Sequence, residues 1–433
     1  MRLTLMAATA GLALGAPITQ SALAAPPSGE AATAKAVKTV LGGAKFAKAK
    51  ASLKGDYDRI VQDIITLTQI EAPPFKEDAR GAAYMEMLKA EGLTDVERDG
   101  VGNVMGLRKG TGGGPLIVVT AHLDTVFPGG TNVKVRREGD TLYAPGIGDD
   151  TSSLPVLLAF IRAMNRAGYA TRSDILFMGN VGEEGPGDLR GTRYLFEKGK
   201  YKDAIKYFIS FEPGRPGRIT NAGTGSRRYK VTFKGPGGHS MGDFGIVNPA
   251  YAMADAMVQF GKIKVPAEPR TVYNVGIVEG GTSVNSIPFA TAMTIDMRSN
   301  GKAALVTEEQ QFLALLQPAV DRENAARSTA KGSISYEAKL IGDRPVGETP
   351  LDKPIVAIAA AVSRASGITP GFGAGSTDSN IPMSLGVEAV TLGSGFETFR
   401  AHSLEEGLKL APEHDLKNMA VGLATVLTLA QAN

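Results

Sequence analysis

Three short apolar runs constrain the fold of this chain more than any other feature. They are Leu116 to Thr120, Ile175 to Met178 and Ile205 to Ser210, the last of which is interrupted by Lys206. A strand covered by helices on both faces has this composition, whereas a half-exposed strand alternates polar and apolar residues. Helical apolar spacing precedes the first run, between Tyr57 and Gly92, and recurs between Leu154 and Met164. The sequence therefore predicts an α/β domain with a buried sheet.

A second structural unit is predicted beyond Gly225, where the pattern changes. Residues 227–234 alternate as in a half-exposed strand. A helix at 249–262, strands near 271–278 and 290–298, a helix at 306–326 and a strand near 333–340 complete a βαββαβ order. We expect a small α+β lid or dimerisation domain at 225–340, inserted between catalytic segments 25–224 and 341–433.

The N-terminus has the pattern of a bacterial signal peptide. Arg2 precedes an apolar run from Leu3 to Ile18, and the small-residue motif Ala22-Leu23-Ala24 follows. We expect residues 1–24 to be removed after Ala24 and the mature protein to be secreted, in a bacterial periplasm, without stable membrane insertion. The Ala- and Lys-rich stretch at 25–54 is expected to be a solvated lead-in or a loosely attached helix.

Charge and cysteine content exclude several classes of protein. Without residues 1–24, 46 Lys and Arg face 44 Asp and Glu, a net charge of +2. So small an excess gives no reason to expect a nucleic-acid partner. The chain has no cysteine, so it has neither disulfides nor thiolate metal ligands.

Acidic and histidine side chains gather where the predicted strands end. They are His122 and Asp124 after the first run, Glu183 and Glu184 after the second, Glu212 after the third, and Asp149 before the helix near Leu154. Open α/β sheets place their sites at these strand ends. Imidazoles and carboxylates without thiolates are typical of a hydrolytic zinc or cobalt site.

Each motif taken alone has a simpler explanation. His122-Leu-Asp124 also occurs as a solvated turn, Asp149-Asp150 also caps helices, and Glu183-Glu184 also forms exposed acidic turns. Taken together, the motifs predict metal-dependent catalysis. Asp124 is expected to orient the imidazole of His122, and a cation is expected to separate the repelling carboxylates. One acid of the Glu183–Glu184 pair can then ligate while the other moves protons.

The motifs in this order resemble those of the M20 family of metallopeptidases, which includes peptidase T, carboxypeptidase G2 and acetylornithine deacetylase. The resemblance covers the chain from about Tyr57 onward, with Gly-Gly-His239-Ser and His402-Ser as later motifs. It implies a large mixed-sheet zinc-exopeptidase domain. It also implies two divalent metal ions, expected to be Zn²⁺ with Co²⁺ or Mn²⁺ as alternatives. The implied metal ligands are His122, Asp149, Glu184, Glu212 and His402.

The resemblance also implies catalytic roles. Asp149 would bridge the two metals and be followed by a cis peptide, and Glu183 would act as general base on a shared hydroxide. His239 would stabilise the oxyanion, from the neighbouring subunit in dimeric members, so a homodimer through the inserted domain is expected. An isolated histidine in a glycine turn is the alternative for His239.

Substrate-binding residues are implied by weaker matches. They are Asn285, Arg298, Arg344 and Gly375, of which Asn285 and Arg298 would hold a substrate carboxylate or backbone. A guanidinium binds carboxylates in a fork, although a strand salt bridge explains Arg298 almost as well. The chain departs from the family's usual pattern after Asp150, where it has Thr151-Ser152-Ser153.

These observations predict a secreted di-zinc hydrolase that cleaves an amide bond in a short peptide or an N-acyl amino acid. The aminopeptidase type is preferred, because the Gly-Asp-Arg344-Pro, Gly375-Ser-Thr-Asp and Ala-His402-Ser motifs resemble peptidase T. An N-acyl amino acid deacylase or a carboxypeptidase of the same family is the alternative. A non-catalytic periplasmic peptide-binding protein, which needs no general base, and a serine hydrolase are poorer interpretations.

Overall fold

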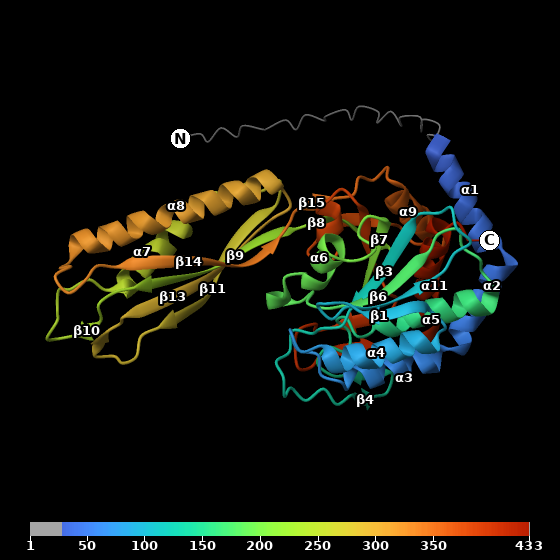
Figure 1. Cartoon of the computed structure of the whole chain (residues 1–433), viewed down its shortest axis with the longest axis horizontal. Coiled ribbons are helices and arrows are strands. Elements are labelled where there is room, and N and C mark those ends of the chain that lie inside the picture. Colours follow the sequence, from blue (N-terminus) through green and yellow to red (C-terminus); the bar gives the residue numbers. More distant parts are fainter. Residues whose placement is uncertain (1–27, 433) are drawn as a thin grey trace, which may run out of the picture.

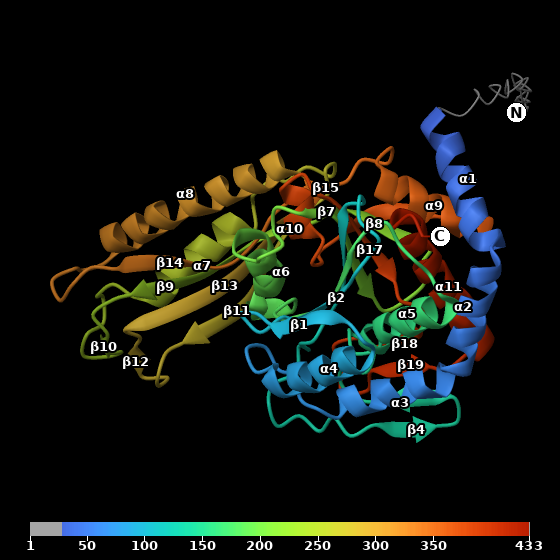
Figure 2. The ribbon, with the colours of Figure 1, turned by 45° about the vertical axis from the view of Figure 1, so that its right-hand side comes forward.

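Two sheets of unequal size organise the part of the chain that the computed structural model describes, residues 28–432. The larger sheet forms a broad body, and the smaller one forms a narrow arm that projects from it (Figures 1 and 2). The expected signal peptide, at 1–24, lies outside the described residues. Within residues 28–432 no helix has the length and apolar character needed to cross a bilayer.

The body is built on a mixed sheet, as predicted. Its order is β1-β2-β6-β3-β7-β17-β8-β15, with β16 beside β8. The central strands β6, β3, β7 and β17 run parallel to one another. The strands are β1 (Thr94–Arg98), β2 (Val104–Arg108), β3 (Leu116–His122), β6 (Ile175–Asn180), β7 (Ile205–Glu212), β8 (Arg218–Gly223), β15 (Gly347–Glu348), β16 (Gly371–Gly375) and β17 (Glu388–Gly393).

Helices cover this sheet and bury its apolar strands. Helix α5 packs on β3, α4 packs on β2, and α9 and α11 pack on β17. Phe160 of α5 meets Phe211 of β7 edge to face, with ring centroids 5.5 Å apart. The helices of the body, apart from two at the N-terminus, are α3 (Tyr57–Thr68), α4 (Asp78–Ala90), α5 (Ser153–Ala167), α6 (Arg190–Glu197), α9 (Pro354–Ala365), α10 (Asn380–Ser384) and α11 (Pro412–Leu429), with a 3₁₀ turn at Gly185–Gly187.

A small antiparallel sheet brings the late segment around His402 toward the segment that leads to Asp149. Its order is β18-β19-β5-β4. Because β19 pairs with β5, the hairpin that carries His402 lies beside the strand before Asp149. The four strands are β4 (Arg136–Glu138), β5 (Thr141–Tyr143), β18 (Glu397–Phe399) and β19 (Gly407–Lys409).

The arm has the predicted βαββαβ order. Its four-stranded sheet, β11-β13-β9-β14, is antiparallel, and α7 and α8 pack against it. Phe233, Phe260 and Phe312 are fully buried in its core. A short pair, β10 with β12, lies at the end of the arm farthest from the body (Figure 1). The elements are β9 (Gly225–Lys234), β10 (Gly238–His239), α7 (Pro249–Phe260), β11 (Thr271–Gly280), β12 (Ser286–Ile287), β13 (Ala290–Ser299), α8 (Lys302–Ala326) and β14 (Ser335–Arg344).

The N-terminal stretch is more tightly packed than expected. Helices α1 (Ser28–Gly42) and α2 (Ala44–Gly55) lie against α9, α11 and α5, on the side of the body away from the arm (Figure 2). Phe46, Ala49 and Leu53 of α2 are buried. The prediction of a solvated or loosely attached lead-in was therefore wrong. Its few apolar residues are spaced so that they share one face, which composition alone does not reveal.

Candidate active site

Three neighbouring strands deliver the predicted site residues to one edge of the sheet. His122 is the last residue of β3, and Glu212 is the last residue of β7. Glu183 and Glu184 follow shortly after β6, whose Asn180 is paired with His122. Because β6, β3 and β7 are adjacent and parallel, their carboxyl ends meet at this edge.

Asp149 lies at the centre of the five predicted metal ligands. Its Oδ1 is 3.0 Å from Nε2 of His122, and its Oδ2 is 3.3 Å from Nε2 of His402. Nε2 of His402 is also 3.0 Å from Oε1 of Glu184. Nε2 of His122 is 3.8 Å from Oε2 of Glu212. The structure therefore brings all five residues together.

This donor set fits divalent cations. Ligand atoms of His122, Asp149 and Glu184 lie within 4.8 Å of one another, as do those of His122, Asp150 and Glu212. Two imidazoles and several carboxylates suit zinc and related ions. Each oxygen of Asp149 faces a different histidine, so this carboxylate would be shared if the cluster held two cations.

The charges of the cluster also favour a cation. Burial, and secondarily the nearby Asp150 carboxylate, raises the pKa of Glu212 well above its usual range. Hydrogen bonds to Asp149 and Glu184 raise the pKa of His402 to about 10. Closely packed carboxylates repel one another, and a divalent cation relieves that repulsion.

The carboxylate of Asp124 fixes the loop after β6. It accepts hydrogen bonds from the backbone amides of Glu183, at 3.1 Å, and of Glu184, at 2.8 Å. Nδ1 of His122 is instead 2.9 Å from the backbone carbonyl of Asp124, and 3.7 Å from its carboxylate. We expected the carboxylate of Asp124 to orient the imidazole, and this was wrong, because the backbone carbonyl of Asp124 contacts the ring instead. The main chain holds His122, and Nε2 is left to face the cluster.

Glu406 also fixes a loop by accepting backbone amides, a role that was not predicted from the sequence. One of its oxygens accepts the amides of Gly148 and Asp149, both at 2.8 Å, and the other accepts the amide of Gly146 at 3.1 Å. Glu406 is fully buried and so fixes the segment that presents Asp149. Its position four residues after His402 was the only signal in the sequence.

Asp150 is a second residue that the sequence-based prediction passed over. The peptide between Asp149 and Asp150 is cis, as the resemblance implied. The Asp150 side chain is fully buried and accepts the backbone amide of His122 at 3.0 Å. It therefore holds the end of β3, and its carboxylate also lies close to that of Glu212.

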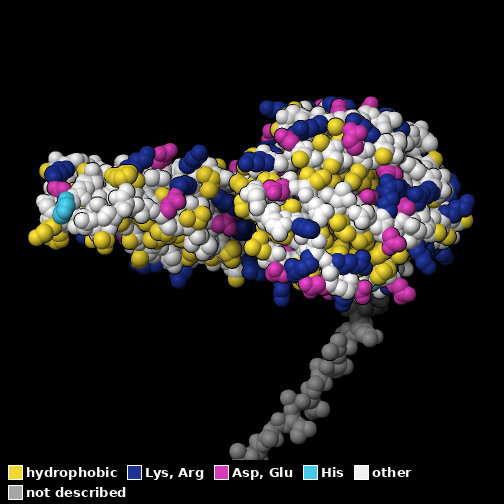
Figure 3. All heavy atoms as spheres, turned by 90° about the horizontal axis from the view of Figure 1, so that it is seen from below, with side chains coloured by type: hydrophobic (Ala, Val, Ile, Leu, Met, Phe, Trp, Pro, Cys, Tyr) yellow, Lys and Arg dark blue, Asp and Glu magenta, His cyan; other side chains and the backbone are white. Residues whose placement is uncertain are grey.

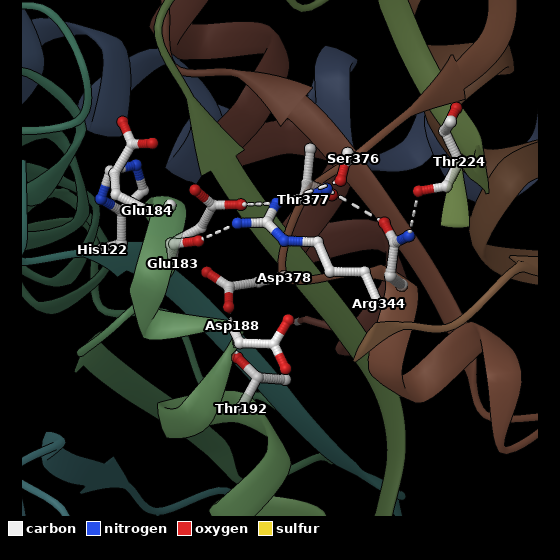
Figure 4. A network of polar contacts seen from close by, with 12 residues as sticks. His122, Glu183, Glu184, Asp188, Thr192, Thr224, Arg344, Ser376, Thr377 and Asp378 are labelled. Atoms are coloured by element: carbon white, nitrogen blue, oxygen red, sulfur yellow. Dashed lines mark hydrogen bonds and ion pairs between the residues drawn. The ribbon is translucent and has the colours of Figure 1, made fainter. Parts of the chain in front are cut away.

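Glu183 is held by an arginine from the base of the arm. Nη1 of Arg344 lies 3.0 Å from Oε1 of Glu183 and 3.0 Å from Oγ of Ser376, and Nη2 donates to the Glu183 carbonyl. Figure 4 shows the guanidinium of Arg344 directed at Glu183. Burial raises the pKa of Glu183 to about 8, while Arg344 lowers it.

A cavity of about 770 Å³ opens over the cluster. Its walls include the predicted base Glu183 and four of the five predicted ligands, which are Asp149, Glu184, Glu212 and His402. Of the residues expected to bind substrate, Arg298, Arg344 and Gly375 line this cavity. The cluster is therefore accessible from this cavity.

His239 and Asn285 do not line the cavity of their own chain. They lie together at the far end of the arm, where Ser240 donates its amide to the Asn285 carbonyl at 3.0 Å. Nδ1 of His239 accepts the amides of Met241 and Gly242, both at 3.2 Å. The proton of the imidazole is thus placed on Nε2, which suits a hydrogen-bond donor.

The same segment, Gly238 to Gly242, matches the letters of the Gly-x-Ser-x-Gly nucleophile elbow. The structure places it in a two-stranded ribbon and a turn, whereas an elbow lies between a strand and a helix. It gives no support to a serine hydrolase.

Comparison with known proteins identifies the family. Residues 118–431 match Peptidase family M20/M25/M40. The chain belongs to this family. M20 enzymes are metal-dependent hydrolases, and the arrangement around Asp149 agrees with that membership.

Two relatives show how far the likeness extends along the chain. Carboxypeptidase G2 of Pseudomonas sp. (strain RS-16) is 28% identical over 264 residues, 56% of this chain and 62% of that protein. The uncharacterized protein YqjE of Bacillus subtilis (strain 168) is 23% identical over 375 residues, 82% of this chain and 95% of its own. The chain thus spans less than two thirds of the first relative and nearly all of the second.

Solved structures show the same M20 fold. The aminopeptidase PepT from Bacillus cereus superposes with a TM-score of 0.68 at 21% identity, covering 86% of this chain and 98% of the other. A tripeptidase from Staphylococcus aureus has a TM-score of 0.70 at 20% identity, with the same coverage. The overall fold is therefore shared with both.

Proposed function

We propose that the protein is a two-metal exopeptidase, with zinc as its metal, that cleaves the amide bond of short peptides. The observation that carries this proposal is the placement of Asp149 between His122 and His402, with Glu183 and Glu184 beside them. A protein that only binds peptides does not need Glu183 next to the ligands. When bound, two divalent ions acidify a water molecule and stabilise negative charge on the substrate carbonyl.

The residues of the chain then have distinct tasks. His122, Asp149 and Glu212 would hold one ion, and Asp149, Glu184 and His402 the other. One oxygen of Glu183 is engaged by Arg344 at 3.0 Å, so the other oxygen would take a proton from water and pass it to the leaving amine. The Asp124 carboxylate holds Glu183 and Glu184 in position by accepting their backbone amides.

The aminopeptidase type is our preferred version of this proposal. The Gly-Asp-Arg344-Pro, Gly375-Ser-Thr-Asp and Ala-His402-Ser motifs favour it, and structures of an aminopeptidase and a tripeptidase share the fold. A carboxypeptidase or an N-acyl amino acid deacylase is the second candidate. Carboxypeptidase G2 and a succinyl-diaminopimelate desuccinylase are among the relatives, and Arg298 in the cavity suits a substrate carboxylate.

We also propose that two copies pair through their arms, so that His239 of one copy completes the site of the other. The outer strand β11 carries exposed apolar side chains, among them Val272, Ile277 and Val278. Hydrophobic side chains lie along much of the arm face seen in Figure 3. A second copy would cover this edge, and sedimentation of the purified protein tests it.

The mature protein is proposed to be secreted to a bacterial periplasm. Support comes from the signal-peptide pattern of residues 1–24. N-terminal sequencing of the protein recovered from a periplasmic extract should begin at Ala25.

Hydrolysis assays test the central proposal. Purified protein with added Zn²⁺ should cleave dipeptides or tripeptides, and a chelator should abolish the activity. Glu183→Ala should retain the metals and lose at least about a hundredfold in kcat, because it lacks the general base. Peptide binding without turnover, unaffected by Glu183→Ala, would support the non-catalytic binding protein instead.

A further inference from the structure

The loop between β7 and β8 forms one wall of the cavity and carries two arginines. Glu212, a predicted ligand, ends β7, and Arg218 begins β8. Arg215 lies between them, and both arginines line the same cavity as Glu184 and His402. The loop therefore places two cationic side chains within the space where substrate is expected.

This loop is held in one conformation by its backbone. The amide of Arg218 donates to the carbonyl of Arg215 at 3.3 Å, which closes a turn with the two arginines at its ends. The Gly214 carbonyl accepts the Gly395 amide at 2.9 Å, and the Gly217 carbonyl accepts an amide from β16 at 2.8 Å. In such a turn the Cα atoms of the first and fourth residues lie within about 7 Å of each other.

The other arginines of the cavity already have acidic partners. Arg344 is paired with Glu183. Arg228 and Arg298 share the two oxygens of Asp296, at 3.1 Å and 2.6 Å.

Arg215 and Arg218 differ from these three. Within residues 28–432 neither has an ion pair or a side-chain hydrogen bond, and both are exposed to the cavity. Two unpaired guanidiniums on one turn repel each other, and an anion between them removes that repulsion. Carboxylates fit best, because a guanidinium binds them in a fork.

We propose that Arg215 and Arg218 form an anion subsite, so that the preferred substrate carries a carboxylate in addition to the one expected at Arg298. This inference rests on the proposed function and narrows its substrate class to acidic peptides or N-acyl amino acids. Because the backbone of the loop is already pinned, binding has to order only the two arginine side chains. The subsite lies next to Glu212 in the chain, so the second carboxylate would bind close to the reacting amide.

Matched substrates test the subsite. Zn²⁺-loaded protein is assayed with the pairs Ala-Glu and Ala-Gln, Glu-Ala and Gln-Ala, and N-acetyl-Glu and N-acetyl-Gln. The two members of each pair differ only in having a side-chain carboxylate or the corresponding amide. Comparison of the pairs shows on which side of the cleaved bond the carboxylate binds. We expect kcat/KM at least about tenfold higher for the acidic member of one or more pairs, with the preference weakened by salt.

Variants assign the preference to the two arginines. In Arg215→Gln/Arg218→Gln the ratio of kcat/KM within a pair should fall to about 1, and the double lysine variant should recover part of it. Arg364→Gln is the matched control, because Arg364 is exposed on α9 and does not line this cavity. It should leave the ratio unchanged.

A binding measurement separates this inference from the proposed function. Titration calorimetry compares glutamate with glutamine on the Zn²⁺-loaded wild type and on the double glutamine variant. Selective glutamate binding that the variant loses, without hydrolysis of any peptide, would retain the subsite and reject the peptidase. Hydrolysis with equal kcat/KM within every pair, or a preference that survives in the double glutamine variant, would overturn the subsite and leave the peptidase standing.

Discussion

Arg344 and Glu183 form a buried ion pair that joins the arm to the candidate catalytic loop. Their closest atoms are 3.0 Å apart, and their side chains are 5% and 7% exposed. Arg344 is the last residue of β14 in the arm, whereas Glu183 follows β6 of the body. The position of the arm and the orientation of the proposed base are thus physically coupled.

Removal of this pair should impair turnover. We expect Arg344→Ala to lower kcat by at least about tenfold, because Glu183 loses the partner that orients one of its oxygens. Breaking a buried pair should also cost about 3 kcal/mol of unfolding free energy. Steady-state kinetics and denaturant unfolding measure the two effects.

Arg364→Gln serves as the control for Arg344→Ala, since it removes an exposed arginine of α9. Metal content is measured alongside, so that a lower kcat caused by loss of metal ions is distinguished from one caused by misorientation of Glu183. A kcat within twofold of the wild type in Arg344→Ala would contradict the orienting role.

Asp124→Asn should weaken metal binding although Asp124 is not a predicted ligand. Its two oxygens accept the amides of Glu183 and Glu184. Asparagine has only one acceptor oxygen, and its amide nitrogen would face a backbone N–H. We expect roughly 10- to 100-fold lower Zn²⁺ affinity, as is typical when a residue that supports ligands is lost. Calorimetric titration measures it, and an unchanged affinity would refute the supporting role.

The sequence predicted the elements well where periodicity was strong. The strands β3 and β6 are buried at every position because helices cover both faces of the central sheet, so the length and composition of their apolar runs sufficed. The alternating strands and long helices of the arm were equally clear. Helices α1 and α2 were misjudged, since their burial depends on α5, α9 and α11, all of which come much later in the chain.

The candidate metal ligands were predicted from the sequence, whereas the residues that hold them in position were not. Imidazoles and carboxylates after strand ends are visible in a sequence, because the chemistry restricts the residue types. The carboxylate of Glu406, which accepts three backbone amides around Asp149, has no such signature. The atom by which Asp124 acts also depends on where the loop of Glu183 lies, and that is a property of the folded chain.

Metal loading should stabilise the protein and should follow a two-ion stoichiometry. Ligand present at 100 times its dissociation constant stabilises the folded state by about 2.7 kcal/mol. We expect the wild type to bind two Zn²⁺ per chain and to unfold at a higher temperature when loaded. His402→Ala should reduce the stoichiometry toward one, because Glu184 and Asp149 lose their imidazole partner.

His414→Ala is the matched control for this measurement. His414 lies on α11 beside Asn418, and it does not line the cavity over the cluster. Elemental analysis after dialysis gives the stoichiometry. Equal metal content in His402→Ala and the wild type would remove His402 from the ligand set.

Glu308, in the core of the arm, should make stability depend on pH. Its side chain on α8 is 1% exposed, and neither carboxylate oxygen has a hydrogen-bond partner. Burial, with a smaller effect of Asp296, raises its pKa from 4.5 to about 8. Between these two values the folded chain binds a proton that the unfolded chain has released. The free energy of unfolding therefore falls as pH rises from about 4.5 to about 8.

Glu308→Gln should remove this dependence, because glutamine stays neutral in both states. We expect the variant to gain about 1–3 kcal/mol over the wild type near pH 8, because only the wild type must there either bind a proton on folding or bury a charged carboxylate. The two proteins should be equally stable near pH 4, where Glu308 is protonated whether or not the chain is folded. Thermal unfolding across this pH range measures the difference, and parallel curves for the two proteins would show that Glu308 is ionised in the folded arm.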